Sequence, residues 1–349
     1  MRINKLLAAL VFGAIAFTSC TDDSPSLPRG DYDGGVLISG EGSGAGTGSV
    51  SFVSDDYETA ENTIYKKVNS TELGTYLQSM AFDTDNAFIV VDNQNTITVV
   101  DRYSFIKEAT ISEELATPRF MTVADNKGYV TNWGTTEAYV AVYDLTSYDF
   151  IKKINIGSGP ERIIESNGKL YVSHKGGWGS NNIISVIDIA TEGVEEITVS
   201  DKPDEMFFNN NGQLVVLSEG AVQYDASWSV IGNTIGSIIT INVSNNTIVS
   251  ELDFASGEHP SLMVLENNTI YYALSGKIYS IDVDATSLST TEIVTAEGYL
   301  YGIEVEGNSL FTLNASFTDE STLNVFDITT KVKTQTKSVA IGASKIYFN

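Results

Sequence analysis

Three tryptophans and two arginines are the residues of this sequence best suited to holding a ligand. Trp133, Trp178 and Trp228 are its only tryptophans, and each lies in a polar, glycine-containing stretch between two segments of alternating apolar residues. Arg119 and Arg162 lie in comparable stretches, ATPRF and SGPERI. Aromatic rings and guanidinium groups are enriched at recognition sites, because they combine a large contact area with directional polar contacts. The pattern therefore predicts ligand binding, and local packing that holds long loops in shape is the alternative interpretation.

Further polar and aromatic residues of such stretches extend the candidate site. The stretch HKGGWGSNN around Trp178 is too long and too aromatic for a simple hairpin turn, which needs only Asn-Gly or Asp-Gly. The loop around Trp228 is longer than its counterparts, and the tract LGTYLQSM, residues 73–80, predicts one helical turn. We add five residues of these loops to the candidate ligand-binding site: Tyr76, His174, Asn181, Tyr224 and Tyr299.

Catalysis has less support in the sequence. There is one cysteine, no Gly-x-Ser-x-Gly stretch follows a strand, and the two histidines lie far apart, whereas a zinc site needs about three protein ligands. Acidic residues do gather near the starts of repeated segments: Glu161, Asp204, Glu205 and Glu258. Crowded carboxyl groups can act as general acids with raised pKa, bind Ca²⁺, or only hydrogen-bond neighbouring loops. We expect a protein that is not an enzyme and that has no cofactor or metal.

The N-terminus predicts export. Two basic residues, Arg2 and Lys5, precede an apolar run over residues 6–17, which is too short to span a membrane and typical of a signal peptide. The run ends in FTSC, which resembles the lipobox of bacterial lipoproteins, with Cys20 as the lipidated residue. Because Cys20 is the only cysteine, it has no disulfide partner within the chain. The following TDDS resembles the acidic signal that directs Bacteroidetes lipoproteins to the outer surface of the outer membrane, and a periplasm-facing position is the alternative.

The charge of the chain limits its partners. Its 45 acidic and 20 basic residues give a formal net charge of −25. Such a surface repels nucleic acid and anionic membrane surfaces. We therefore expect no nucleic-acid partner and membrane attachment through the lipid alone.

A strand that ends in a polar residue recurs along the chain. The segments TVVD, AVYD, SVID, ITIN, YSID and NVFD follow one another at intervals of roughly 45 residues, the length of one propeller blade. Each unit contains four short segments that alternate with period two, and helical periodicity is nearly absent. An earlier copy, SFVS, brings the number of units to seven. The sequence therefore predicts an all-β fold, a seven-bladed β-propeller with four-stranded antiparallel blades.

The two ends of the repeat region complement each other. The first unit begins at GVLIS without an innermost strand, whereas the chain ends with an extra strand, GASKIYFN, which aligns with GPERIIE. A C-terminal strand that completes the first blade would remove the open sheet edges. We therefore predict a signal peptide at 1–19, a lipid-anchored tether at 20–33 and the propeller at 34–349.

Propeller geometry places the candidate residues on one side of the molecule. The loop between the second and third strands of a blade emerges on the same face as the connector to the next blade, and all the candidate ligand-binding residues fall in or beside such segments. We call this side the loop face. The aspartates that end the recurring strands fall on the opposite face, where we expect them to accept backbone hydrogen bonds in tight turns.

Several stretches of the chain resemble known propellers. YVTN at 129–132 and the repeat around it are similar to the YVTN-type seven-bladed propellers. The stretches ISGEGSGAGTGSVSFVS, TPRFM and QLVVLSEG resemble a family of Bacteroidetes propeller lipoproteins, over essentially the whole exported chain. The best-understood members of that family capture cobalamin at the cell surface and sit on a TonB-dependent outer-membrane transporter. The resemblance thus implies a cobalamin ligand and such a transporter as partner.

These observations lead to one functional hypothesis with two alternatives. We expect a surface-anchored lipoprotein that binds a nutrient on the loop face and passes it to an outer-membrane transporter. A glycan- or protein-binding propeller of an uptake system is the first alternative, because tryptophans also stack on sugar rings. A propeller hydrolase or lyase that uses Glu161 or Asp204 is the second.

Overall fold

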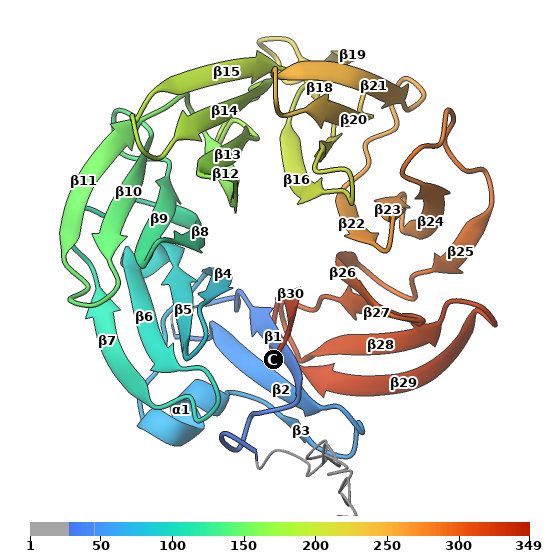
Figure 1. The fold of residues 1–349 in the computed structure, drawn as a ribbon. Coiled ribbons are helices and arrows are strands. Elements are labelled where there is room, and N and C mark those ends of the chain that lie inside the picture. The colour runs from blue at the N-terminus through green and yellow to red at the C-terminus, as the bar shows by residue number, and fades with distance from the viewer. Residues whose placement is uncertain (1–27, 45) are drawn as a thin grey trace, which may run out of the picture.

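The computed structural model describes residues 28–44 and 46–349 and contains seven four-stranded antiparallel sheets arranged as a ring (Figure 1). In each sheet one edge strand faces the central axis and the other lies at the rim. The predicted all-β, seven-bladed propeller is therefore confirmed. The predicted signal peptide, Cys20 and most of the predicted tether lie outside the described residues. Among the residues that are described, no helix is long and apolar enough to cross a bilayer.

The strands of the first four blades follow, each from the axis to the rim. Blade 1 contains β30 (Ala343–Phe348), β1 (Gly35–Gly40), β2 (Ser49–Ser54) and β3 (Ala60–Glu61). Blade 2 contains β4 (Leu77–Phe82), β5 (Asn86–Val91), β6 (Thr96–Asp101) and β7 (Lys107–Ile111). Blade 3 contains β8 (Pro118–Ala124), β9 (Lys127–Asn132), β10 (Tyr139–Asp144) and β11 (Phe150–Asn155). Blade 4 contains β12 (Pro160–Ser166), β13 (Lys169–His174), β14 (Ile183–Asp188) and β15 (Val194–Thr198).

The remaining three blades have the same order. Blade 5 contains β16 (Pro203–Phe208), β17 (Leu214–Ser218), β20 (Ser237–Asn242) and β21 (Thr247–Asp253). Blade 6 contains β22 (Leu262–Glu266), β23 (Thr269–Leu274), β24 (Lys277–Asp282) and β25 (Glu292–Thr295). Blade 7 contains β26 (Leu300–Glu306), β27 (Ser309–Asn314), β28 (Ser321–Asp327) and β29 (Val332–Val339).

The ring is closed by the C-terminal strand, as predicted. Strand β30 pairs antiparallel with β1, with Leu37 opposite Tyr347 and Ile38 opposite Ile346. The first blade therefore combines the first and last strands of the chain, and β1 is paired on both of its edges.

Apolar side chains hold adjacent blades together face to face. Seven buried clusters occur, one for each interface between neighbouring blades. The interface of blades 1 and 7, for example, packs Val36 and Ile38 against Phe311 and Leu323. Because both faces of the middle strands are covered in this way, strands such as β9 and β17 are buried almost throughout, whereas rim strands such as β15 expose most of their residues.

The recurring aspartates form the expected turns on the face opposite the loop face. Asp144 Oδ1 accepts the Thr146 backbone N–H at 2.7 Å, and Asp327 Oδ1 accepts that of Thr330 at 2.6 Å. These backbone hydrogen bonds lower the pKa of both carboxyl groups, because they stabilise the charged form. Their role is structural.

Three local features differ from the simple repeat. The helical turn expected within residues 73–80 does not form there; a short helix, α1 (Ile64–Asn69), precedes that tract in the same connector, and β4 begins at Leu77. A 3-10 turn, η1 (Asp92–Gln94), occupies the loop of blade 2. In blade 5 the long loop contains an additional hairpin, β18 (Val222–Tyr224) and β19 (Val230–Asn233).

The segment before β1 packs against the face opposite the loop face. Tyr32 is buried, and its ring makes edge contacts with Phe52 and Phe105. Arg29 lies over the Tyr103 ring at 3.9 Å and pairs with Asp85. The ordered contacts of the propeller therefore extend to residues just before β1.

Candidate functional site

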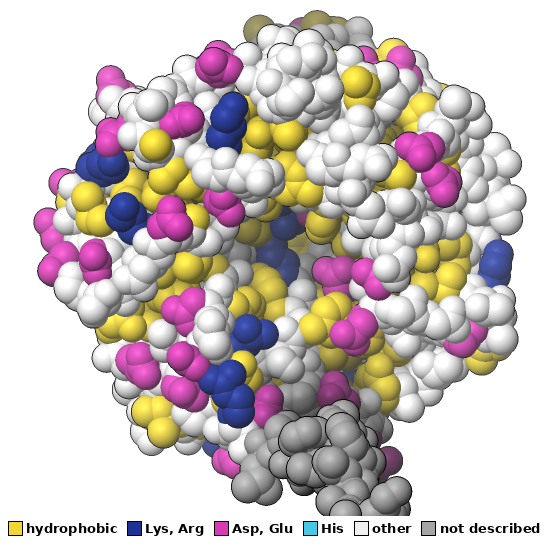
Figure 2. All heavy atoms as spheres, in the orientation of Figure 1, with side chains coloured by type: hydrophobic (Ala, Val, Ile, Leu, Met, Phe, Trp, Pro, Cys, Tyr) yellow, Lys and Arg dark blue, Asp and Glu magenta, His cyan; other side chains and the backbone are white. Residues whose placement is uncertain are grey.

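A cavity of about 1020 Å³ occupies the centre of the ring. Its lining comes from the innermost strands and from the loops and connectors of the loop face. The space-filling view shows a hollow at the centre of the molecule with Lys or Arg side chains inside it (Figure 2). Six of the ten predicted ligand-binding residues line this cavity: Tyr76, Arg119, Trp133, Arg162, Trp178 and Tyr299.

Five charged lining residues enter the cavity at the start of three successive inner strands. Strands β8, β12 and β16 each begin with a proline, and their ladders shift register between that proline and the third residue after it. Such an irregularity re-aims the side chains of the residues that it contains. The charged residues concerned are Arg119 on β8, Glu161 and Arg162 on β12, and Asp204 and Glu205 on β16.

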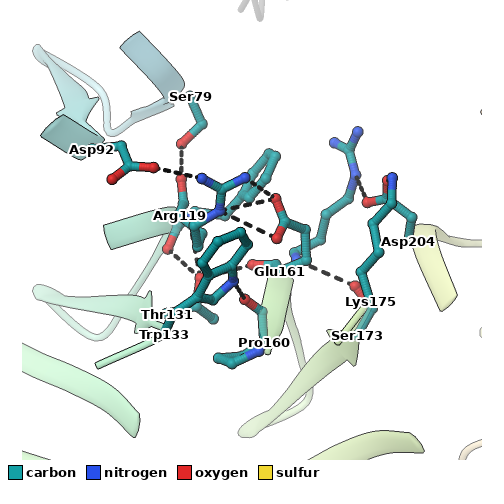
Figure 3. A network of polar contacts seen from close by, with 12 residues as sticks. Ser79, Asp92, Arg119, Thr131, Trp133, Pro160, Glu161, Ser173, Lys175 and Asp204 are labelled. Carbon is teal, nitrogen blue, oxygen red and sulfur yellow. Dashed lines mark hydrogen bonds and ion pairs between the residues drawn. The ribbon is translucent and has the colours of Figure 1, made fainter. Parts of the chain in front are cut away.

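Arg119 is held by two carboxylates and an indole ring (Figure 3). Its Nη1 donates to Asp92 Oδ2 and its Nη2 to Glu161 Oε1, each at 2.7 Å. The guanidinium carbon lies 4.2 Å from the centroid of the Trp133 ring, and the indole Nε1 donates to the Pro160 carbonyl oxygen at 3.0 Å. Burial raises the pKa of Asp92 in spite of its pairing with Arg119. This arrangement fixes the orientation of the Trp133 ring at the cavity wall.

A second ion-pair network continues around the wall. Arg162 pairs with Asp204 and Glu205, and Lys175 Nζ contacts Asp204 Oδ2 and Glu219 Oε1, each at 2.7 Å. Burial opposes ionisation of Asp204, but Lys175 and Arg162 overcome it and hold its pKa well below the usual range. Burial, reinforced by the charge of Asp204, raises the pKa of Glu205 to about 8. The surroundings therefore shift the pKa of these two adjacent carboxyl groups in opposite directions.

Aromatic side chains occupy two opposite sectors of the cavity lining. Trp178 is 96% exposed, and its ring lies at 5.6 Å from that of Trp133 in an edge-on arrangement. The Tyr299 and Tyr301 rings stack at 5.3 Å, and the Tyr301 hydroxyl donates to Glu41 Oε1 at 3.1 Å. The tryptophans follow β9 and β13, whereas the tyrosines lie at the start of β26, across the ring (Figure 1). The cavity therefore offers a polar wall between two apolar platforms.

Two residues predicted to bind ligand brace a loop instead of lining the cavity. The His174 side chain is fully buried, with Nε2 at 2.8 Å from Ser185 Oγ and Nδ1 at 3.2 Å from the Ser158 carbonyl oxygen. Asn181 Nδ2 donates to the same carbonyl at 2.9 Å. Burial lowers the pKa of His174 to about 4, so the ring is neutral at pH 7. Both side chains tie the loop that carries Trp178 to the connector before β12.

Two further predicted residues lie on the blade-5 hairpin. Tyr224 and Trp228 are exposed, with Trp228 at 82%, and their rings lie 6.0 Å apart. Neither is among the residues that line the cavity. The structure therefore separates the three tryptophans into a pair at the cavity and a single one on the hairpin.

The structure also brings in cavity residues that the sequence reasoning missed. Lys175, Glu219, Tyr301 and Lys345 all line the cavity. Lys345 had a detectable signal, because the alignment of ASKIYF with PERIIE places it at the position of Arg162. Among the described residues, no group of three or more His, Cys, Asp or Glu side chains is arranged to hold a metal ion.

Comparisons with known proteins agree with the fold. A periplasmic gluconolactonase from Pseudomonas aeruginosa superposes with a TM-score of 0.66 at 13% identity, covering 90% of this chain and 98% of that one. A functionally unknown protein from Desulfotomaculum acetoxidans gives 0.65 at 14% identity, covering 90% and 99%. The dihydro-heme d1 dehydrogenase NirN gives 0.59 at 13% identity, covering 93% and 77%. No curated protein sequence matches significantly. The family described as "Domain of unknown function (DUF5074)" matches residues 34–341, and the chain belongs to this family.

Proposed function

We propose that this protein is a non-enzymatic binding lipoprotein of the cell surface, which holds a small-molecule nutrient in the central cavity and passes it to a TonB-dependent outer-membrane transporter. The observation that carries the binding role is the cavity itself. At about 1020 Å³ it lies at the upper end of the range for small-molecule sites. Its polar groups are fixed in advance by ion pairs, which reduces the ordering cost of binding. The lipoprotein part of the proposal rests on the N-terminal sequence that ends in Cys20.

A corrinoid is the ligand that we propose first. The support for this choice is the sequence resemblance to cobalamin-capturing lipoproteins. A broad, partly apolar ring with amide groups at its edge also suits two aromatic platforms separated by a polar wall. A glycan is the alternative, since Trp133 and Trp178 offer the same surface to a sugar ring.

Calorimetry with two tryptophan variants tests the proposal. Cyanocobalamin and a panel of oligosaccharides are titrated into the wild type, Trp178→Ala and Trp228→Ala. Both tryptophans are exposed, but only Trp178 lines the cavity, so Trp228→Ala is the matched control. We expect saturable binding that Trp178→Ala weakens by about 2 kcal/mol or more, roughly 30-fold, and that Trp228→Ala leaves unchanged.

Three results would contradict this assignment. Binding weakened only by Trp228→Ala would move the site to the hairpin. Binding of a sugar and not of cyanocobalamin would replace the corrinoid with a glycan. Absence of binding by every probe would remove the small-molecule role.

A hydrolase or lyase is a second candidate, and the raised pKa of two cavity carboxyls favours it. Burial raises the pKa of Glu205 to about 8 and that of Glu304 to about 7, values suited to a general acid at neutral pH. Glu161 and Asp204, the acids named in the sequence-based alternative, are also engaged in ion pairs, and the pKa of Asp204 is lowered. If a substrate panel reveals turnover, Glu205→Gln and Glu304→Gln should identify the acid by loss of kcat with KM retained.

A further inference from the structure

Side chains from four blades meet near the axis of the ring. The Arg162 guanidinium of β12 lies 4.7 Å from the centroid of the Phe120 ring of β8. The Lys345 amine of β30 lies 5.3 Å from the same centroid. Arg162 also pairs with Glu205 of β16. These strands lie on different sides of the central opening (Figure 1), so their side chains approach one another across it. We call Phe120, Arg162, Glu205 and Lys345 the axial cluster.

Lys345 differs from the other cations that line the cavity, because it has no carboxylate partner among the described residues. Arg119, Arg162 and Lys175 each contact two carboxylates. Within residues 28–44 and 46–349, by contrast, the Lys345 amine makes no hydrogen bond or ion pair, although it lines the same cavity. A partly buried ammonium group without a counter-ion is unfavourable, because its lost hydration is not replaced. Accordingly, burial and the nearby charge of Arg162 lower the pKa of Lys345.

Among the described residues, no carboxyl group near the axis makes an ion pair with the Lys345 amine. Glu205 pairs with Arg162 instead, and burial raises its pKa. The adjacent Asp204 is ionised but is shared between Arg162 and Lys175. The charges of Glu41, Glu205 and Asp204 favour the ammonium form of Lys345, but none of these carboxyl groups contacts the amine, so its hydrogen-bond donors are free for an anionic group that enters the cavity.

We propose that the axial cluster is an anion subsite, in which the Lys345 amine donates hydrogen bonds to a phosphate or carboxylate group of the bound ligand. This inference rests on the proposed function, because it names the ligand group that reaches the axis. Arg162 supplies a second positive charge, held in place by its own carboxylate partners. The aromatic platforms would then bind the rest of the ligand, so that the two parts of the cavity select different features.

Titration with simple anions tests the subsite separately from the nutrient. Inorganic phosphate and acetate are titrated into the purified protein at constant ionic strength, with chloride as the background anion. The variants are Lys345→Met, which removes the charge, and Lys345→Arg, which keeps it. Lys107→Met, on the exposed rim strand β7, is the matched control. We expect saturable binding of phosphate or acetate by the wild type, weakened at least tenfold in Lys345→Met and retained in Lys345→Arg and Lys107→Met.

Proton linkage adds a readout that a purely structural lysine would not change. Anion binding should raise the lowered pKa of Lys345, so titrations in two buffers of different ionisation enthalpy should reveal proton uptake in alkaline solution. The uptake should disappear in Lys345→Met. A difference between phosphate and acetate affinity then tells which anion the subsite prefers.

The outcomes separate this inference from the proposed function. No saturable binding of either anion, or equal affinity in Lys345→Met and wild type, would overturn the subsite even if cyanocobalamin or a sugar binds. Anion binding that survives Trp178→Ala while every larger ligand fails would support the subsite and reject the proposed ligand class.

Discussion

Acidification should destabilise this protein in part through His174. The side chain is fully buried, and it contacts Ser185 Oγ at 2.8 Å and the Ser158 carbonyl oxygen at 3.2 Å. A carbonyl oxygen only accepts, so Nδ1 carries the proton and the neutral ring fits the site. Burial lowers the pKa of His174 from 6.5 to about 4. As the pH falls, the unfolded chain therefore binds this proton first, and the free energy of unfolding declines from about pH 6.5 until it levels off near pH 4.

The size of this effect follows from the two pKa values. The fall in pKa from 6.5 to about 4 corresponds to roughly 3 kcal/mol when both states are fully titrated. Between pH 7 and pH 4.5, where the folded state is only partly titrated, about 2 kcal/mol of this free energy should be lost. Carboxyl groups titrate in the same range, so the effect of His174 must be isolated by comparison with a variant.

Urea unfolding of the wild type and of His174→Gln at pH 7 and at pH 4.5 isolates the contribution of His174. Glutamine keeps a donor and an acceptor but does not titrate. We expect His174→Gln to be less stable than the wild type at pH 7 and to lose about 2 kcal/mol less on going to pH 4.5. A parallel decline of the two proteins would refute the buried, neutral histidine. A shift of ligand affinity in His174→Gln as large as that in Trp178→Ala would restore its role as a ligand contact.

Three further predictions concern the framework of the site. Arg119→Met should lower the free energy of unfolding by about 3–5 kcal/mol, because it leaves buried Glu161 without its partner. Adding Glu161→Gln should recover part of the loss. A loss of less than about 1 kcal/mol in Arg119→Met, measured by urea unfolding, would contradict this prediction. Gly159 has φ +63° and would place a Cβ 2.1 Å from the Gly176 backbone, whereas Gly168, at φ +77°, faces open space. Gly159→Ala should therefore unfold at a lower temperature than the control Gly168→Ala, and equal melting temperatures would show that the Trp178 loop adjusts freely. Removal of residues 343–349 should abolish cooperative unfolding and cause aggregation, because β1 and the interface with blade 7 lose their partner strand. Size-exclusion chromatography measures the aggregation. A monodisperse, cooperatively folded product would count against closure by β30.

The blades and their closure could be predicted from the sequence because their signals are local. Period-two alternation marks each strand, and an aspartate at its end marks the turn that follows, as Asp144 and Asp327 confirm. Closure by β30 could be predicted because the first unit lacks its innermost strand and the chain ends with an extra strand. The position of the short helix α1 was not predicted correctly, because the long connector that contains it has no equivalent in the other repeats for comparison.

The individual roles of site residues were harder to predict, because they depend on the direction of each side chain at the end of a strand. His174 is the last residue of β13, at the position that Asn132 has in β9. Asn132 is also fully buried and accepts the Ala116 backbone N–H, so this position braces a connector in both blades. Comparing the repeats at this position would have revealed a structural role for His174. Trp228 could not be separated from Trp178 in this way, because the hairpin that carries it occurs in one blade alone among the described blades.

Closure by the last strand also sets the order in which the chain can reach its final state. Leu37 and Tyr347 face each other in one sheet although nearly the whole chain separates them. Such non-local pairing folds slowly, because the ends must meet before the contact gives any stability. During synthesis, blade 1 stays incomplete until the final residues have left the ribosome, so a nascent chain cannot form the closed ring. If the chain is exported as we propose, this delay is an advantage, because the closed ring cannot form before translation ends and can form on the far side of the membrane.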